Sequence, residues 1–183
     1  PLLEQSGLVH HGFSTRMGEV STGIYESMNL SFTRGDEDAS VRENFERFGA
    51  AIGVRTSDMV FSRQTHTSNV RIVTEEDRGK GIVCPVDYDN VDGLVTDVPG
   101  RLPCDILCRL CSAVFLDPVR KVIGLSHSGG AGLWQNRPGN GEEDAGSLWK
   151  PPGGYSGMYR PSICQSCYEV SGDVIDAFRE SFS

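Results

Sequence analysis

The chain has 183 residues, enough for one well-packed domain, and its 38% hydrophobic and 23% charged residues are ordinary for a folded protein. A formal net charge of -8 argues against nucleic acid or an anionic membrane as a partner, because both require a basic surface. No apolar run is long enough for a transmembrane helix and the first residues lack a secretory signal, so we expect a cytoplasmic protein without a disulfide framework.

The first fifty residues predict an extended segment followed by a helix. Residues 11–32 are strand-like at both ends, with a turn rich in glycine and serine between them. Residues 38–52 have the three- and four-residue apolar spacing of an amphipathic helix, and Gly53 follows as a stop signal. The apolar positions of that helix are Val41, Phe45, Phe48 and Ile52.

Short strands are predicted beyond this helix. Residues 59–61, 70–73 and 92–96 are apolar runs of strand length, and Gln64-Thr65-His66 lies in the turn between the first two. Residues 113–116 and 121–125 predict a hairpin that turns at Asp117-Pro118.

The last third of the chain has two different patterns. Residues 129–161 are rich in glycine and proline and show neither helical nor strand periodicity, which is unusual for so long a stretch of an enzyme domain. Near the C-terminus, Ser171 and Asp173 are capping candidates for a helix that buries Val174, Ile175 and Phe178.

Two of the four histidines are candidates for chemistry. His127 ends an apolar strand and opens into a glycine-rich segment, which is where α/β proteins place functional groups. His66 lies in a polar turn. The pair His10-His11 is better explained as surface histidines.

The cysteines permit a competing site. Cys108 and Cys111 form one Cys-x-x-Cys pair, and Cys164 and Cys167 form another, so the four thiolates could hold a structural zinc. In that arrangement Cys111 is not available to a site with the histidines.

Two polar residues of the N-terminal segment could contact a substrate. Arg16 could bind a phosphate or carboxylate through bidentate hydrogen bonds from its planar guanidinium. It could equally be an exposed arginine in a turn, without a function. Asn29 could line the same pocket or form a turn.

The chain resembles the bacterial laccase-domain family, whose members are called multicopper polyphenol oxidases and purine nucleoside phosphorylases. The resemblance is carried in order by HGFSTRMGEVSTGIYESMNL, GDEDASVRENFERFGAAIGV, QTH, DGLVTDVPG, LDPVRKVIGLSHSG and PSICQSCYEVSGDVIDAFRE, about three quarters of the chain. It implies a YfiH-like α/β fold in which helices flank mixed β-sheets. It also implies that residues 1–183 form a single domain that lacks the C-terminal part of the family.

The resemblance implies a metal centre of two imidazoles and one thiolate. The family holds zinc, or copper in some accounts, with the histidine of a Gln-x-His motif, the cysteine of an Ala-Asp-Cys motif and a second histidine. By position these are His66, Cys111 and His127. Three protein ligands leave the fourth position of a tetrahedral zinc open, which is typical of a catalytic site. The implied reaction is phosphorolysis of adenosine, inosine, guanosine and methylthioadenosine, together with deamination of adenosine, with Arg16 and Asn29 as substrate-binding residues.

The chain departs from the family in two stretches. The Ala-Asp-Cys motif is missing, and the count back from Asp117 places the family cysteine at Leu110, one place before Cys111. We hypothesise that residues 103–114 and 129–161 are shifted-frame readings of a family gene, because one frame of the first stretch permits LVTSYADCVPL. The mass of the intact protein tests this hypothesis.

Three alternatives remain open from the sequence. Copper at the same site could oxidise phenolic substrates, although four histidines are too few for the full copper set of a multicopper oxidase. The cysteine could instead act as a thiolate nucleophile with a histidine base. The Cys-x-x-Cys pairs could stabilise a non-enzymatic zinc domain.

Overall fold

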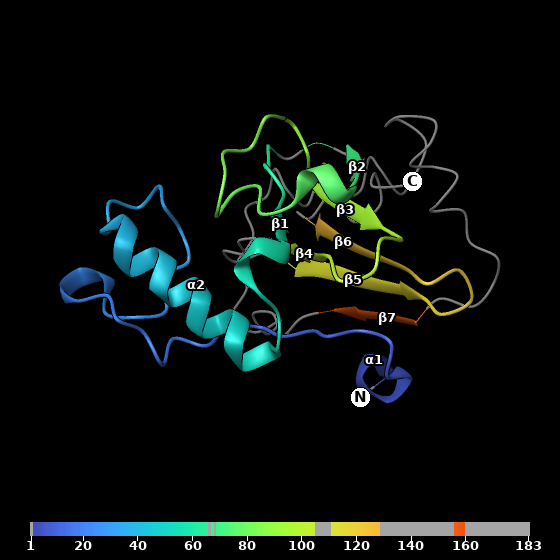
Figure 1. The fold of residues 1–183 in the computed structure, drawn as a ribbon, viewed down its shortest axis with the longest axis horizontal. Coiled ribbons are helices and arrows are strands. Elements are labelled where there is room, and N and C mark those ends of the chain that lie inside the picture. The colour runs from blue at the N-terminus through green and yellow to red at the C-terminus, as the bar shows by residue number, and fades with distance from the viewer. Residues whose placement is uncertain (1, 66, 68, 105–110, 129–155, 160–183) are drawn as a thin grey trace, which may run out of the picture.

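A computed structural model describes residues 2–65, 67, 69–104, 111–128 and 156–159 of the chain. Within these residues the strands form a mixed five-stranded sheet in the order β2-β3-β6-β5-β7 (Figure 1). The first pair is parallel and the other three pairs are antiparallel. The strands are β2 Val70–Ile72, β3 Gly93–Thr96, β6 Val122–Ser128, β5 Cys111–Asp117 and β7 Ser156–Tyr159. The predicted α/β class with mixed sheets is confirmed.

The hairpin of β5 and β6 turns where the sequence predicts it. Oδ1 of Asp117 accepts hydrogen bonds from the backbone N–H groups of Val119 and Arg120, at 2.9 and 3.0 Å. Lys121 completes the turn with a φ of 57°. The Asp-Pro signal therefore acts through the aspartate side chain, which satisfies the amides of the turn.

A second, two-stranded sheet pairs β1 Met59–Phe61 in parallel with β4 Leu102–Cys104. β1 agrees with the predicted strand, whereas β4 was not predicted. Pro103 lies in the middle of β4, and proline is rare in strands because it cannot donate to the ladder. Tertiary pairing with β1 overrides that local preference.

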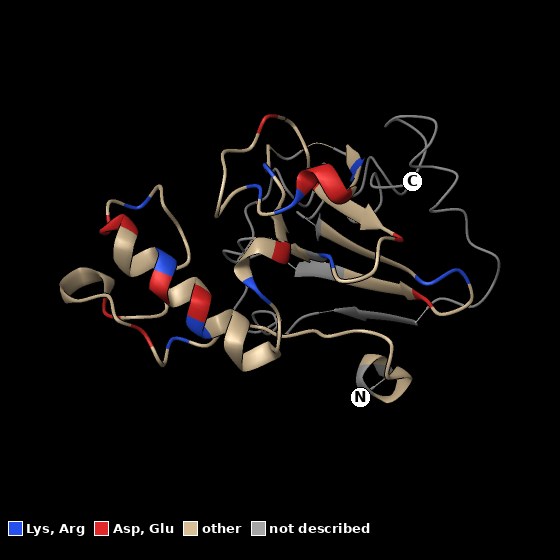
Figure 2. Ribbon diagram, viewed as in Figure 1, with Lys and Arg blue, Asp and Glu red and all other residues tan. Residues whose placement is uncertain are grey.

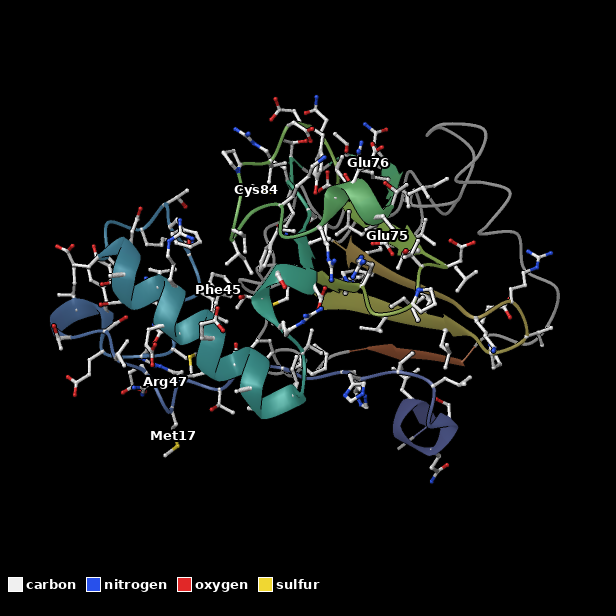
Figure 3. All side chains as sticks on the ribbon, viewed as in Figure 1. Met17, Phe45, Arg47, Glu75, Glu76 and Cys84 are labelled. Carbon is white, nitrogen blue, oxygen red and sulfur yellow. The ribbon has the colours of Figure 1, made fainter. Side chains whose placement is uncertain are left out.

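The helix α2 Asp38–Ile52 has the bounds that the sequence predicts, and Gly53 ends it in the left-handed conformation with a φ of 73°. Its buried face carries Val41 and Phe45, which is labelled in Figure 3, and the ring of Phe45 meets the ring of Phe61 edge-on at 5.4 Å. Acidic and basic residues alternate along α2 in Figure 2, and those at positions 42, 43, 46 and 47 are exposed. The helix therefore joins the core along one stripe.

β1 divides the core into two clusters. Met59 and Phe61 pack with the residues of α2, while Val60 packs with Val73 and Leu94 in a second cluster. Because neighbouring residues of a strand point to opposite faces, both faces of β1 are buried.

The predicted strands at the ends of residues 11–32 are wrong. The structure has no strand in this segment, whose one regular element is the 3-10 helix η1 Gly23–Tyr25. Side chains take the place of a strand partner: Oδ1 of Asn44 accepts the N–H of Val20 at 2.9 Å, and Nδ2 of Asn44 donates to the carbonyl of Asn29 at 3.0 Å. The segment is an extended loop held against α2.

Two further elements differ from the sequence analysis. Residues 156–159 form β7, although no strand was predicted in residues 129–161, and the short helix α1 Leu2–Ser6 contacts β7 near the N-terminus (Figure 1). The predicted C-terminal helix lies outside the described residues. Among the helices that the structure describes, none has the length and apolar character needed to cross a bilayer.

Candidate metal centre

The loop between β1 and β2 is held by one carboxylate. His66 itself lies outside the described residues, but both of its neighbours are described. Oδ2 of Asp92 accepts the backbone N–H of Thr65 at 3.2 Å and the backbone N–H of Thr67 at 2.9 Å. The same oxygen accepts the hydroxyl of Thr67 at 2.8 Å. Asp92 therefore bonds to the chain on both sides of position 66.

Backbone groups reinforce this attachment. The carbonyl of Asn69 accepts the N–H groups of both Asp92 and Gly93, at 3.0 and 3.1 Å. The hydroxyl of Thr65 donates to Oδ1 of Asn90 at 2.9 Å. Asn90 has a φ of 56°, a conformation that asparagine tolerates in turns. The loop before β2 and the turn before β3 thus form one bonded unit.

This unit lies beside the end of β6. Gly93, the first residue of β3, pairs with Ser126 of β6, and His127 is the next residue of that strand. The backbone of His127 is described and its side chain is not. His127 therefore lies at one end of this sheet, and the two neighbours of His66 are attached to the same end through Asp92.

Cys111 begins β5 at the same end of the sheet. Its register partner on β6 is Ser128, while His127 pairs with Ser112. Opposed residues share a face of the sheet and successive residues alternate between faces. By register, His127 and Ser112 belong to one face and Cys111 belongs to the other. Leu110, the position that the family count favours, lies outside the described residues.

The side chains that the structure describes contain no group of three His, Cys, Asp or Glu residues arranged to hold a metal. The imidazoles of His66 and His127 and the thiol of Cys111 are not among those side chains. The four cysteines of the alternative Cys-x-x-Cys site also have no described side chains. The described backbone places Cys111, His127 and the two neighbours of His66 at one end of the sheet.

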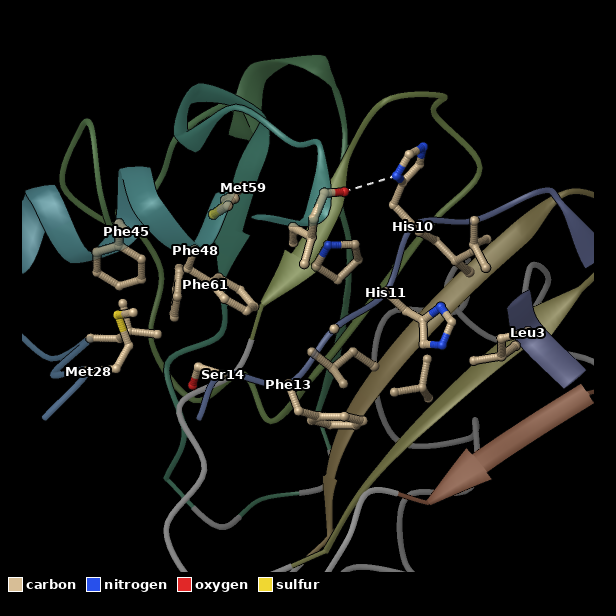
Figure 4. A pocket seen from close by; sticks show the side chains of 18 of the residues that line it. Leu3, His10, His11, Phe13, Ser14, Met28, Phe45, Phe48, Met59 and Phe61 are labelled. Atoms are coloured by element: carbon tan, nitrogen blue, oxygen red, sulfur yellow. Dashed lines mark hydrogen bonds between the residues drawn. The ribbon is translucent and has the colours of Figure 1, made fainter. Parts of the chain in front are cut away.

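A cavity of about 410 Å³ lies against the middle of the β5–β6 hairpin and the part next to its turn (Figure 4). It is lined mainly by apolar side chains, including Phe13, Met28 and Phe48, with Asn29 among its polar residues. Val114 and Leu125 of the hairpin also line it, and they pair two register positions from His127, about 7 Å along the strands. Its volume lies within the range of small-ligand sites, roughly 300–1,000 Å³.

The predicted substrate residues differ in their environment. Arg16 lies in an exposed turn beside Met17, which is 80% exposed and points away from the ribbon (Figure 3). No hydrogen bond or ion pair of its guanidinium is found in the part of the chain that the structure describes. The carbonyl of Arg16 accepts the N–H of Met28 at 3.2 Å, so this turn is tied to the rim of the cavity.

The side chain of Asn29 is engaged within its own loop. Its Nδ2 donates to Oδ2 of Asp36 at 3.0 Å, and its Oδ1 accepts the N–H of Ser31 at 3.1 Å. The hydrogen bond from Asn29, together with one from Ser21, holds the pKa of Asp36 below its ordinary value. Asn29 lines the cavity, and these bonds orient it as a turn residue.

Comparison with known proteins identifies the family. The family described as multi-copper polyphenol oxidoreductase laccase matches residues 10–183. The chain belongs to this laccase family.

Relatives within the laccase family carry enzymatic names. The chain is 33% identical to a purine nucleoside phosphorylase of Deinococcus radiodurans, over 98% of this chain and 67% of that protein. It is 32% identical to the purine nucleoside phosphorylase YlmD of Bacillus subtilis, over 92% of this chain and 61% of that protein. One relative, 28% identical over 92% of this chain, is named adenosine deaminase RL5.

Solved structures agree with this assignment. The fold matches the hypothetical protein YfiH of Bacillus licheniformis with a TM-score of 0.77, at 25% identity over 92% of this chain and 64% of that one. YlmD of Geobacillus stearothermophilus matches with a TM-score of 0.75 at 26% identity. The chain therefore has the laccase-family fold and spans about three fifths of the length of the Bacillus subtilis relative.

Asp92 is the residue of this centre that the sequence analysis missed. Its position within DGLVTDVPG was used there only as part of the family pattern. The available signal was an aspartate directly before the apolar run of a strand and next to a glycine. The sequence cannot show that this carboxylate bonds to Thr65 and Thr67, which lie 27 and 25 positions earlier in the chain.

Proposed function

We propose that this member of the laccase family is a metal-dependent purine nucleoside phosphorylase that also deaminates adenosine. The observation that carries the proposal is that Cys111, His127 and the residues on both sides of His66 lie at one end of a sheet, whose β5–β6 hairpin also lines a cavity of about 410 Å³. The names of the relatives from Bacillus and Deinococcus support the same substrate class. The expected substrates are adenosine, inosine, guanosine and methylthioadenosine, with phosphate as the second substrate.

In this proposal His66, Cys111 and His127 would hold zinc, with copper as the alternative metal. Imidazole nitrogen and thiolate sulfur are the donors that zinc prefers, so the chemistry of the three residues fits the metal. When bound, the metal supplies Lewis-acid polarisation of a substrate oxygen or of a water molecule. The alternation of faces between Cys111 and His127 makes the cysteine the ligand most in need of a direct test.

The remaining residues bind and orient the substrates. Apolar side chains of the cavity, Phe13 and Phe48 among them, cover the faces of the purine, while the exposed guanidinium of Arg16 binds phosphate through two parallel hydrogen bonds. A phosphate oxygen attacks the anomeric carbon of the ribose, and the bond from that carbon to the purine nitrogen breaks. The purine leaves with the electron pair and takes up a proton.

Deamination uses a different electrophile in the same substrate. Water adds to the carbon of adenine that carries the amino group, and the amino group takes up a proton and leaves as ammonia. The product is inosine, which is itself a substrate for phosphorolysis. One centre beside one cavity can therefore serve both reactions.

The test is incubation of the zinc-loaded chain with inosine and phosphate, with ribose 1-phosphate and hypoxanthine measured by chromatography. His127→Ala is expected to abolish product. Val119→Ala is the matched control, because Val119 lies in the same hairpin at its far end and is 88% exposed. Absence of product from the zinc-loaded chain, or equal rates for the two variants, would contradict the proposal.

Assays on the same preparation test two alternative functions. Oxidation of a phenol by the copper-loaded chain, without nucleoside cleavage, would support the polyphenol oxidase that the family description names. Stoichiometric zinc with neither activity, retained in His127→Ala, would support a non-enzymatic zinc domain held by the Cys-x-x-Cys pairs.

A further inference from the structure

Asp92 is buried, with 1% of its surface exposed, yet it is a charged residue in a loop region. A buried carboxylate is costly unless hydrogen bonds replace its hydration. One of its oxygens accepts three donors, the N–H groups of Thr65 and Thr67 and the hydroxyl of Thr67. We propose that Asp92 is the positioning residue of the metal centre, which orients the peptide groups on both sides of His66.

The argument rests on where these donors lie in the chain. The N–H of Thr67 belongs to the peptide that follows residue 66, and the N–H of Thr65 belongs to the peptide that precedes Thr65. One oxygen therefore holds the two residues that flank His66 in the chain. An irregular loop that is already ordered loses less conformational entropy when its side chain binds a metal.

Asp92 also connects this loop to the strand that pairs with β6. Its own N–H is bonded to the carbonyl of Asn69, and its neighbour Gly93 pairs with Ser126, next to His127. The carboxylate thereby links the loop of His66 to the strand of His127. Groups that orient metal ligands without touching the metal typically change its affinity by 10–100-fold when removed.

The inference rests on the metal centre proposed above, and it is tested without substrate. Zinc affinity of the full chain is measured by competition with a chromophoric chelator, and the visible spectrum of the cobalt-substituted chain reports ligand geometry. Asp92→Ala is expected to weaken zinc binding by at least about tenfold. Asp92→Asn keeps an oxygen acceptor and is expected to fall between the wild type and Asp92→Ala.

Asp77→Ala is the matched control for loss of stability. Asp77 is also buried, and its Oδ2 accepts the N–H of Thr74 at 2.9 Å, so it holds a threonine turn in the same way. It lies in the 3-10 helix η3 Glu75–Asp77, whose first residues Glu75 and Glu76 are labelled in Figure 3. Zinc affinity of Asp77→Ala is expected within about twofold of the wild type, even where its unfolding midpoint falls more than that of Asp92→Ala.

The outcomes separate this inference from the proposed function. Equal zinc affinities and cobalt spectra for Asp92→Ala and Asp77→Ala would overturn the inference, whether or not inosine is cleaved. Wild-type zinc affinity that is unchanged in His66→Ala would overturn the inference and the metal centre together. A tenfold loss in Asp92→Ala, with no turnover of inosine by the wild type, would support Asp92 as a positioning residue and remove only the phosphorylase proposal.

Discussion

Nη1 of Arg101 donates to Oδ1 of Asp58 at 3.0 Å, although 43 residues separate them in the chain. Both side chains are almost buried, at 5% and 10% exposure. Arg101 precedes β4, and Asp58 ends the 3-10 helix η2 Thr56–Asp58, which leads into β1. The ion pair therefore joins the starts of the two strands of the smaller sheet. A second bond, from Nη2 of Arg101 to Glu75, extends it toward η3.

Replacement of this arginine tests the ion pair. Arg101→Met is expected to lower the free energy of unfolding by about 2–3 kcal/mol, because Asp58 then keeps only its more exposed partners. Arg55→Met is the matched control: Arg55 bonds to the same aspartate but is 73% exposed, so a loss below about 1 kcal/mol is expected. Urea denaturation followed by circular dichroism measures both. Equal losses of unfolding free energy in the two variants would show that burial does not make the Arg101–Asp58 pair more stabilising than an exposed pair.

Asn44 holds the N-terminal loop against α2. Asn44→Ala leaves the N–H of Val20 and the carbonyl of Asn29 without their partner, and a loss of about 2–3 kcal/mol of unfolding free energy is expected. Glu43→Ala, one residue away on the exposed face, removes only a surface pair with Arg47 and is expected to cost less than about 0.5 kcal/mol. Thermal or urea unfolding compares the two variants. A small loss in Asn44→Ala would mean that water replaces the amide.

Acid is expected to destabilise the protein through its buried carboxylates. Burial raises the pKa of Asp77, but hydrogen bonds from Lys80, Thr74 and Arg71 outweigh it and hold that pKa below the ordinary 3.8. A carboxyl with a lowered folded-state pKa stabilises the fold above its unfolded pKa, and this contribution is lost as the pH falls through the folded value. Stability should therefore drop below about pH 4.

The dependence on Asp77 is checked by urea unfolding at several values of pH. Asp77→Asn should be less stable than the wild type at neutral pH and show a shallower fall in unfolding free energy below about pH 4. Parallel curves for the two proteins would assign the acid sensitivity to other carboxyls.

Tyr88 is expected to ionise at a higher pH than an ordinary tyrosine. Burial raises its pKa from 10.0 to about 12, and its hydroxyl donates to the carbonyl of Phe61 at 2.5 Å. Because the unfolded chain ionises this phenol first, the contribution of Tyr88 to stability is complete below about pH 10 and is lost as the pH rises toward 12. In an alkaline titration followed by tyrosinate absorbance, Tyr88→Phe should lack one of the tyrosines that ionise at the highest pH in the wild type. An unchanged titration curve would refute the assignment.

The register of the hairpin makes a prediction about the thiolate. Since His127 pairs with Ser112 and not with Cys111, Cys111→Ser is expected to weaken zinc binding less than His127→Ala. Moving the thiol by one place, in the double variant Cys111→Ser with Ser112→Cys, should restore or strengthen binding. Chelator competition measures all three. A loss in Cys111→Ser as large as in His127→Ala would show that the strand end departs from regular pleating.

The local patterns of the sequence determined the elements that depend on neighbouring residues. The spacing of Val41, Phe45, Phe48 and Ile52 and the stop at Gly53 predict α2 with its bounds, because a helix needs only local hydrogen bonds and one apolar stripe. The hairpin of β5 and β6 follows in the same way from two apolar runs and the Asp117-Pro118 turn. The position of His127 near the end of a strand follows from these same local signals.

Only the tertiary structure decided the relationships between distant segments. Residues 11–32 were expected to contain strands, but Asn44 of α2 bonds two of their backbone groups, and no pattern within the segment reveals a partner on another element. Pro103 lies in a strand because β1 supplies the pairing. The attachment of the His66 loop to β3 through Asp92 likewise depends on a carboxylate 25 and 27 residues from its donors, and chain folding alone brings such groups together.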